Sequence, residues 1–161
     1  MNTSSAEHLE TLIEYRQAFD RLLAATRQHL RIYDQDLREL ALDTPQRMDA
    51  LRSLCLSGPG RRIQILLRDW NVVRDKQPRL MGLLQHFGHM LEIRQEEALD
   101  EAPMEAYVLG DDRLILTRPH RDNARSLLHP DDPLACGAHT HTFDQLWQRA
   151  EGPLASRPLG L

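Results

Sequence analysis

Apolar residues recur every three or four positions near the start of the chain, with charged residues between them. This spacing predicts an amphipathic helix over residues 6–27, with Ser4 or Ser5 as its N-cap. The next segment, residues 29–34, alternates apolar Leu30 and Ile32 with polar side chains, which is typical of a short strand. We expect this strand to end at Asp34.

Two further helix and strand pairs follow. Thr44 and Pro45 form an N-cap and a first helical residue, and the helix they open ends at residues 57–60. The apolar run 63–67 predicts a buried strand that ends at Asp69. Pro78 opens another helix, which ends near Gly88, and residues 89–94 form the third strand. Short connections between alternating strands and helices indicate parallel strands with right-handed crossovers.

The rest of the chain has a different pattern. Residues 95–103 form an acidic loop, and residues 105–109 and 113–117 flank a turn at 110–112, which predicts a β-hairpin. A short helix is expected at 123–128, and Thr142 is expected to cap a last helix that ends near residue 152. Together these patterns predict one α/β domain over residues 1–152, followed by a Pro/Gly tail over 153–161. Its sheet is mixed and mostly parallel, with helices on both faces and a late hairpin.

Composition narrows the class of protein. The 161 residues include 20 basic and 24 acidic side chains, for a net charge of −4, so a nucleic-acid partner is unlikely on this balance. No apolar run approaches a membrane span, and the N-terminus has no leader pattern. We therefore expect a cytoplasmic protein without a membrane contact, and Cys55 and Cys136 as reduced thiols. Residues 60–80 carry a net charge of +4 and residues 96–112 carry a net charge of −7. These two segments either bind partners or other copies of the chain, or they are ordinary solvated surface.

Ligands in open α/β sheets bind beyond the carboxyl ends of the strands. The predicted strand ends and the edge of the hairpin carry six such side chains: Asp34, Asp69, Arg94, Arg118, His120 and Arg121. Carboxylates, guanidinium groups and an imidazole together can bind an anion or transfer protons. Alternatively, Asp34 and Asp69 cap nearby loops and pair with Arg68 or Arg31.

Several common chemistries have no signature in the sequence. His120, His129, His139 and His141 lack the spacing of a metal site, and no metal or other cofactor is predicted. The glycine patterns of phosphate loops, dinucleotide folds and nucleophile elbows do not occur. Cys55 falls on the apolar face of its helix, which favours a core role. Lys76 is the only lysine in the chain, so any mechanism that needs a lysine must use it.

The succession of elements resembles one half of a phospholipase D superfamily fold. More closely, it is similar to an uncharacterised bacterial phospholipase-D-like domain family that is often fused behind a GNAT acetyltransferase domain. The segments that carry this resemblance are 30–37, 92–95, 143–147 and 159–161. The resemblance covers nearly the whole chain and implies an acetyltransferase-linked partner.

Active members of that superfamily carry HxKxxxxD on the first hairpin strand, followed by a small-residue turn and an Asn. Here the segment aligns in two registers. Ending on Asp112 puts Glu105 and Tyr107 where His and Lys belong, whereas ending on Asp111 puts Met104 and Ala106 there. Neither register supplies a nucleophile.

The resemblance therefore implies a non-catalytic binding or regulatory module. Arg118, His120, Arg121, Asn123 and Arg125 would form an anion-binding edge, or pair with the acidic stretch. A homodimer is expected from the way halves of this fold pair. The alternative is a divergent phosphodiesterase in which His120 is the base or nucleophile and Arg118 and Arg121 bind the phosphate.

Overall fold

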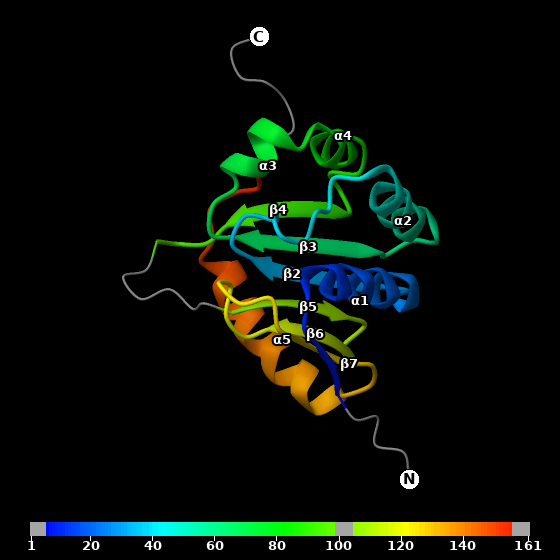
Figure 1. The fold of residues 1–161 in the computed structure, drawn as a ribbon. Helices are drawn as coiled ribbons and strands as arrows, with labels where there is room; N and C mark the ends of the chain where they lie inside the picture. Colours follow the sequence, from blue (N-terminus) through cyan, green and yellow to red (C-terminus); the bar gives the residue numbers. More distant parts are fainter. Residues whose placement is uncertain (1–5, 99–104, 156–161) are drawn as a thin grey trace.

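A mixed sheet of seven strands runs through the computed structural model, which describes residues 6–98 and 105–155 (Figure 1). The strands are β1 (Glu7–Leu9), β2 (His29–Asp34), β3 (Arg62–Leu67), β4 (Leu91–Gln95), β5 (Ala106–Gly110), β6 (Leu114–Arg118) and β7 (Ser126–His129). The helices are α1 (Leu12–Ala25), α2 (Pro45–Leu56), α3 (Asn71–Lys76), α4 (Pro78–His86) and α5 (Pro133–Gln148). Neighbouring strands follow the order β1-β7-β6-β5-β2-β3-β4.

The direction of the strands confirms the predicted fold class. β2, β3 and β4 are parallel neighbours, and the antiparallel pairings of the other strands make β1 and β6 point the same way as β2. Only β5 and β7 run in the opposite direction among the described strands. The hairpin of β5 and β6 joins the parallel part through β2. The sheet is thus mixed, with most of its strands sharing one direction.

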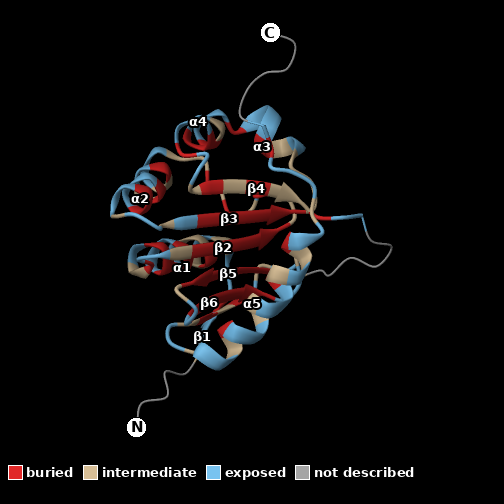
Figure 2. Cartoon of the chain, turned by 180° about the vertical axis from the view of Figure 1, so that it is seen from behind, coloured by how far each residue is buried: buried red, intermediate tan, exposed pale blue. Residues whose placement is uncertain are grey.

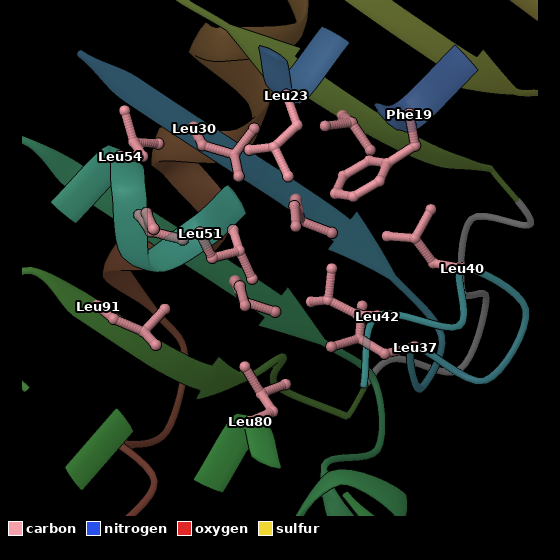
Figure 3. Packing of buried hydrophobic residues seen from close by; sticks show 14 of the residues in the cluster. Phe19, Leu23, Leu30, Leu37, Leu40, Leu42, Leu51, Leu54, Leu80 and Leu91 are labelled. Carbon is pink, nitrogen blue, oxygen red and sulfur yellow. The ribbon is translucent and has the colours of Figure 1, made fainter. Parts of the chain in front are cut away.

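Helices cover both faces, as predicted. One core cluster joins α1, α2 and α4 to one face of the sheet, and Figure 3 shows Phe19, Leu30 and Leu51 within it. A second cluster lies under α5 on the other face, where Phe143 and Trp147 pack against side chains of β5 and β6. Figure 2 shows α5 in front of these strands. Each strand in the middle of the sheet is therefore buried by hydrophobic packing on both sides.

The first predicted helix begins later than expected. Thr11 is its N-cap and forms a capping box with Glu14: the Thr11 hydroxyl accepts from the Glu14 N–H at 3.1 Å, and the Glu14 carboxylate accepts from the Thr11 N–H at 3.1 Å. Residues 7–9 form β1, which pairs with β7. The cap predicted at Ser4 or Ser5 lies outside the described residues. Leu9 matched the helical spacing only by coincidence, because it packs from a strand.

The second half of the chain contains the other corrections. The helix predicted at 123–128 is wrong, because Ser126–His129 forms strand β7 between β6 and β1. The last helix begins at Pro133 rather than at Thr142, since the Asp132 carboxylate caps it by accepting from the Ala135 N–H at 3.0 Å. The short helix α3 was not predicted. Leu154 is buried and donates its N–H to Ile93 at 2.8 Å, so it belongs to the packed structure rather than to the predicted tail.

The turn of the hairpin is held to the start of β2 by one carboxylate. Asp111 and Asp112 adopt positive φ angles of 52° and 60°, which Asp tolerates better than most residues. The Asp111 carboxylate accepts from the N–H groups of Arg27, Gln28 and His29 at 2.7, 2.8 and 3.0 Å. Burial opposes ionisation, but these donors hold the pKa of Asp111 below its usual value. Asp111 therefore has a structural role in this chain.

Gly110 precedes that turn in a space too small for a side chain. A Cβ at this position would overlap the Thr26 hydroxyl and would lie 3.2 Å from Leu114 Cδ1. We expect Gly110→Ala to lower the free energy of unfolding by about 1–3 kcal/mol through overpacking, measured by urea denaturation. Gly82→Ala is the matched control, because nothing lies within 4 Å of a Cβ there and alanine stabilises a helix by about 0.5–1 kcal/mol relative to glycine. Equal stability of the two variants would contradict this account of the hairpin.

Within residues 6–98 and 105–155, none of the helices combines the length and apolar composition that a membrane span requires. Cys55 and Cys136 are both buried free thiols.

Candidate functional site

The carboxyl ends of β2 and β6 lie at the same edge of the sheet. Asp34 is the last residue of β2 and Arg118 is the last residue of β6. Both strands point the same way, with β5 between them. A polar loop follows each strand end, so two segments about 80 residues apart in the sequence meet at this edge.

The loop after β2 is shaped by its own apolar residues. Leu37, Leu40 and Leu42 are buried in the core (Figure 3), and Leu37 and Ala41 adopt positive φ angles of 67° and 52°. The Asp34 carboxylate accepts from the Leu37 N–H at 3.1 Å. Left-handed conformations at non-glycine residues cost free energy, which the burial of the three leucines offsets. Polar residues between the leucines are therefore held at the surface.

The loop after β6 is organised by Arg118. This side chain is 4% exposed, and its guanidinium donates to the carbonyl of Asn123 at 2.8 Å and to that of Arg121. It also lies over the ring of Tyr15, 5.8 Å from the centroid. Arg121 in turn donates to the side-chain oxygen of Gln35, which joins the two loops. Both guanidinium groups are thus oriented before any ligand arrives.

A cavity of about 250 Å³ opens where these loops meet. Three arginines and four carboxylates line it together with one amide; the lining residues are Asp34, Gln35, Asp36, Arg38, Glu39, Arg118, Arg121 and Asp122. Two of the carboxylates have cations nearby: Asp36 lies 3.9 Å from Arg38, and Glu39 lies 3.9 Å from Arg16, which is outside the cavity. The site is therefore polar, of mixed charge, and rich in hydrogen-bonding groups.

Asp34 is the most perturbed acid of the site. Its burial, followed by the nearby Asp36 carboxylate, raises its pKa to about 6, against the N–H groups of Gln35 and Leu37 and the charge of Arg118. Burial also raises the pKa of the Tyr15 hydroxyl, and the charge of Asp34 adds to this effect. The net charge of the cavity therefore becomes more positive as the pH falls through about 6.

The structure separates the residues that the sequence analysis grouped together. Asp34, Arg118 and Arg121 line the cavity. Asn123 contributes its carbonyl to Arg118, while its side chain accepts from the Arg125 N–H at 3.0 Å. His120 does not line the cavity; its side chain is 54% exposed, and its Nδ1 accepts from the Asp122 N–H at 3.2 Å.

The other two predicted residues have structural roles elsewhere. The Asp69 carboxylate accepts from the Asn71 N–H at 2.8 Å and so shapes the turn before α3. The guanidinium of Arg94 lies 4.4 Å from the centroid of the Trp147 ring and donates to the Trp147 carbonyl at 2.9 Å. Arg94 therefore fastens the end of α5 to β4. Both Asp34 and Asp69 cap the loops that follow them, as the alternative predicted.

The start of β5, where the HxKxxxxD resemblance would place a nucleophile, is packed with other side chains. Tyr107 is 3% exposed, and its ring lies 5.1 Å from that of Tyr33 and 4.8 Å from that of His139. Glu105 lies 3.4 Å from His139 Nε2, and this contact raises the pKa of His139. Ala106 is buried in the strand, and Met104 lies outside the described residues.

Further polar groups extend this packing. Both carboxylate oxygens of Glu96 accept from the Tyr33 hydroxyl at 2.9 Å, and Glu96 lies 3.4 Å from Arg68. Burial raises the pKa of Tyr33 to about 12. Arg68 thus pairs with Glu96 rather than with Asp34 or Asp69.

Sequence reasoning missed five of the eight residues that line the cavity, Asp122 among them. Gln35, Asp36, Arg38 and Glu39 line it, and a polar run directly after a strand end was a usable signal for them. Tyr15 had no comparable signal, because an aromatic residue on the apolar face of a helix indicates only a core position. No cluster of three or more His, Cys, Asp or Glu side chains suited to a metal ion occurs in the described part of the chain.

Comparison with known proteins identifies the family. Residues 11–159 match the model of a family described as a domain of unknown function, DUF7931. The chain belongs to the DUF7931 family. No curated protein matches the sequence.

Solved structures share the fold of this DUF7931 domain at low sequence identity. Nuc from Salmonella typhimurium, a phospholipase D family member, is 10% identical with a TM-score of 0.61, over 91% of this chain and 97% of that one. NucT from Helicobacter pylori is 14% identical with a TM-score of 0.65, over 92% and 98%. The fold is therefore that of phospholipase-D-like proteins.

A third similar structure is larger. TrmBL2, an archaeal chromatin protein with a novel mode of DNA binding, is 13% identical with a TM-score of 0.68. The match covers 94% of this chain, which spans 55% of that protein. At this identity the similarity concerns the fold alone.

Proposed function

We propose that this domain is a non-catalytic, phospholipase-D-like binding module that holds a small anionic ligand in the cavity at the carboxyl ends of β2 and β6. The observation that supports this most directly is that two oriented guanidinium groups, those of Arg118 and Arg121, line that cavity. Guanidinium forks match the geometry of phosphate and carboxylate oxygens. Because their own hydrogen bonds already orient them, little side-chain entropy is lost on binding.

The carboxylates of the cavity suggest a second feature of the ligand. Asp36 and Asp122 line the same cavity, and carboxylate oxygens accept hydrogen bonds. A ligand that carries hydroxyl or amine donors beside its anionic group would contact both the guanidinium groups and the carboxylates. A volume of about 250 Å³ suits a small molecule such as a phosphorylated polyol rather than a polymer.

The start of β5 supports the absence of catalysis. In one register Glu105 and Tyr107 take the places of the histidine and the lysine of active relatives, and Tyr107 is buried between two other rings. Burial raises the pKa of its hydroxyl above the usual value, which makes it a poor nucleophile at neutral pH. Lys76, the only lysine, lies on α3. We infer that packed side chains occupy the positions that the histidine and the lysine hold in active relatives.

The pH dependence of anion binding tests the proposal. Sulfate is the best first probe, because its own charge is constant across neutral pH. We expect sulfate to bind about three- to tenfold more tightly at about pH 5 than at about pH 7.5, because Asp34 is neutral at the lower pH and no longer repels the anion. Titration calorimetry, or NMR shifts of the Gln35 and Arg121 amides, would measure this.

Two variants make the experiment specific. Arg121→Met should abolish sulfate binding, whereas Arg125→Met should leave it unchanged, since Arg125 is 74% exposed and pairs with Glu10 instead. Glycerol phosphate should bind more tightly than sulfate if the carboxylates of the cavity contact its hydroxyl groups. Binding that is equal in both variants would show that the cavity is not the site.

The alternative of a phosphodiesterase that uses His120 has no geometric support. His120 is exposed and lies outside the cavity, and its Nδ1 already accepts from the backbone of Asp122. A general base has to lie within hydrogen-bond reach of the reacting group. Turnover of any member of a phosphodiester panel by the unmodified protein, lost in His120→Ala, would nevertheless overturn the non-catalytic proposal.

The remaining predictions concern the assembly and the setting of the domain. We infer a homodimer with twofold symmetry, the commonest arrangement for a single-chain oligomer; sedimentation at micromolar concentration that shows only monomer would contradict it. A regulatory link to an acetyltransferase and a cytoplasmic location also stay predictions. The −4 net charge argues against a nucleic-acid partner.

A further inference from the structure

A second cavity, of about 380 Å³, lies between the carboxyl-terminal halves of α1 and α2, which run side by side across the sheet (Figures 1 and 2). It is near the amino ends of β2 and β3, at the edge of the sheet opposite to the cavity already described. Ala24 on α1 and Ala50 on α2 line it together with Leu23 and Leu54. These two short side chains leave space between the helices, and the two buried leucines provide an apolar floor.

The charged groups of this cavity are all of one sign. Arg27 and Arg61 line it, and no acidic residue does so in the described part of the chain. Neither guanidinium group has a carboxylate oxygen within 4 Å among the described residues, and the Asp111 carboxylate contacts Arg27 only at its backbone N–H. By contrast, Asp49 lines the cavity between α2 and α4, where Arg52 is paired with it at 3.2 Å. The guanidinium groups of Arg27 and Arg61 therefore have no ion-pair partner among the described residues.

Arg61 is held in place by its neighbours. Its Nε donates to the Ser57 hydroxyl at 3.0 Å and its Nη1 to the Pro59 carbonyl at 3.3 Å. Gly58 makes room for it, because a Cβ at that position would lie 2.9 Å from Nη2. A guanidinium that is oriented by short-range contacts loses little entropy when an anion binds.

A structural role for the arginines has to be weighed, because cations stabilise helix carboxyl termini. Here three carbonyls near the ends of the two helices already have donors from the capping residues. Thr26 donates its hydroxyl to the Leu22 carbonyl at 2.8 Å and its N–H to the Leu23 carbonyl at 3.2 Å. Ser57 donates both its hydroxyl and its N–H to the Leu54 carbonyl, at 2.7 and 3.2 Å. These caps leave the arginines available for another partner.

We propose that this cavity binds an organic anion, with a phosphate or carboxylate group between Arg27 and Arg61 and an apolar body against Leu23 and Leu54. The exposed Ser53 hydroxyl, which also lines the cavity, is a further hydrogen-bond donor for the anionic group. This site does not depend on the proposed function at the other edge of the sheet. The apolar floor distinguishes its ligand from the hydroxyl-rich ligand inferred there.

Three probes test the chemistry: phenyl phosphate, benzoate and inorganic phosphate. In an NMR titration, phenyl phosphate or benzoate should produce saturable shifts in the amides of residues 24–27 and 53–61. The better of the two should bind about tenfold more tightly than inorganic phosphate, since a buried ring contributes roughly 1–2 kcal/mol. The comparison of phenyl phosphate with benzoate identifies the anionic group.

Variants separate this site from the other cavity and from a structural role of the arginines. Arg61→Met should weaken binding about tenfold through the loss of one charged hydrogen-bonding group. Ala24→Glu, at an exposed position that tolerates a helix-forming residue, should abolish binding without a loss of fold. Arg74→Met is the matched control on α3, and Arg121→Met should affect only sulfate binding at the other edge.

Two results would overturn the proposal. One is the absence of saturable shifts with both aromatic anions at millimolar concentration. The other is unchanged affinity in Arg61→Met and Ala24→Glu; in that case a loss of stability in Arg61→Met would assign the arginine to the helix termini alone.

Discussion

Arg118→Met is expected to lower the free energy of unfolding by about 2–4 kcal/mol, the range for losing a charged donor that serves several buried or partly buried acceptors. The guanidinium is 4% exposed and donates to the carbonyls of Arg121 and Asn123. Without it, the loop after β6 loses its anchor and Asp34 loses the neighbouring positive charge of Arg118. Methionine fills the volume of the apolar part of the arginine side chain beside Tyr15. The loss of stability therefore comes mainly from removal of the guanidinium group.

The same variant should abolish sulfate binding at the cavity. Denaturation with guanidinium chloride would measure the free energy of unfolding, and titration calorimetry would measure sulfate binding. Arg125→Met, seven residues further on, should change stability by less than about 0.5 kcal/mol, because exposed ion pairs contribute little. Stability of Arg118→Met close to that of the unmodified protein would mean that the loop after β6 is held by other contacts.

Asp34→Asn should stabilise the protein at neutral pH and leave its stability unchanged in acid. The pKa of Asp34 rises from 3.8 to about 6 on folding, and each unit corresponds to about 1.4 kcal/mol. Between these two values the folded state keeps the proton while the unfolded state releases it, so stability falls as the pH rises from about 4 to about 6. With asparagine at this position the stability no longer falls over this pH range, because the amide oxygen can accept a hydrogen bond from the Leu37 N–H without carrying a charge.

The expected gain is therefore about 2–3 kcal/mol at about pH 7.5 and close to zero at about pH 4. Urea denaturation at both pH values would measure it. Asp49→Asn is the control, since the Asp49 side chain is 76% exposed and should show no such dependence. A destabilised Asp34→Asn protein at neutral pH would show that the ionised carboxylate is instead favoured by Arg118. The variant should also bind sulfate equally at both pH values.

Strands and helices with a strong period were predictable from the sequence. The alternation at residues 29–34 and the apolar run at 63–67 both form strands, but β3 ends at Leu67 and not at Asp69 as predicted. Thr44 and Pro45 act locally as cap and first helical residue, and α2 begins there. In contrast, residues 126–129 are too few to have a period of their own. They form β7 because β6 and β1 lie on either side of them.

The candidate site was predictable in part, for residues at a strand end or in the loop directly after it. Asp34 and Arg118 end strands that point the same way, and the rule about carboxyl ends located both. The same rule was wrong for Arg94, because Trp147, 53 residues later, lies against its guanidinium. His120 is near the cavity in the sequence, but its turn directs it to solvent.

By itself, the sequence determined the class of fold and most of the elements, since each depends on residues that are neighbours in the chain or on composition. The tertiary structure decided which charged side chains share a cavity, that Asp34 is buried beside Arg118, and that Arg27 and Arg61 border the space between α1 and α2. These features depend on contacts between distant segments. Burial, which shifts a pKa and orients a guanidinium, exists only once those segments have packed together.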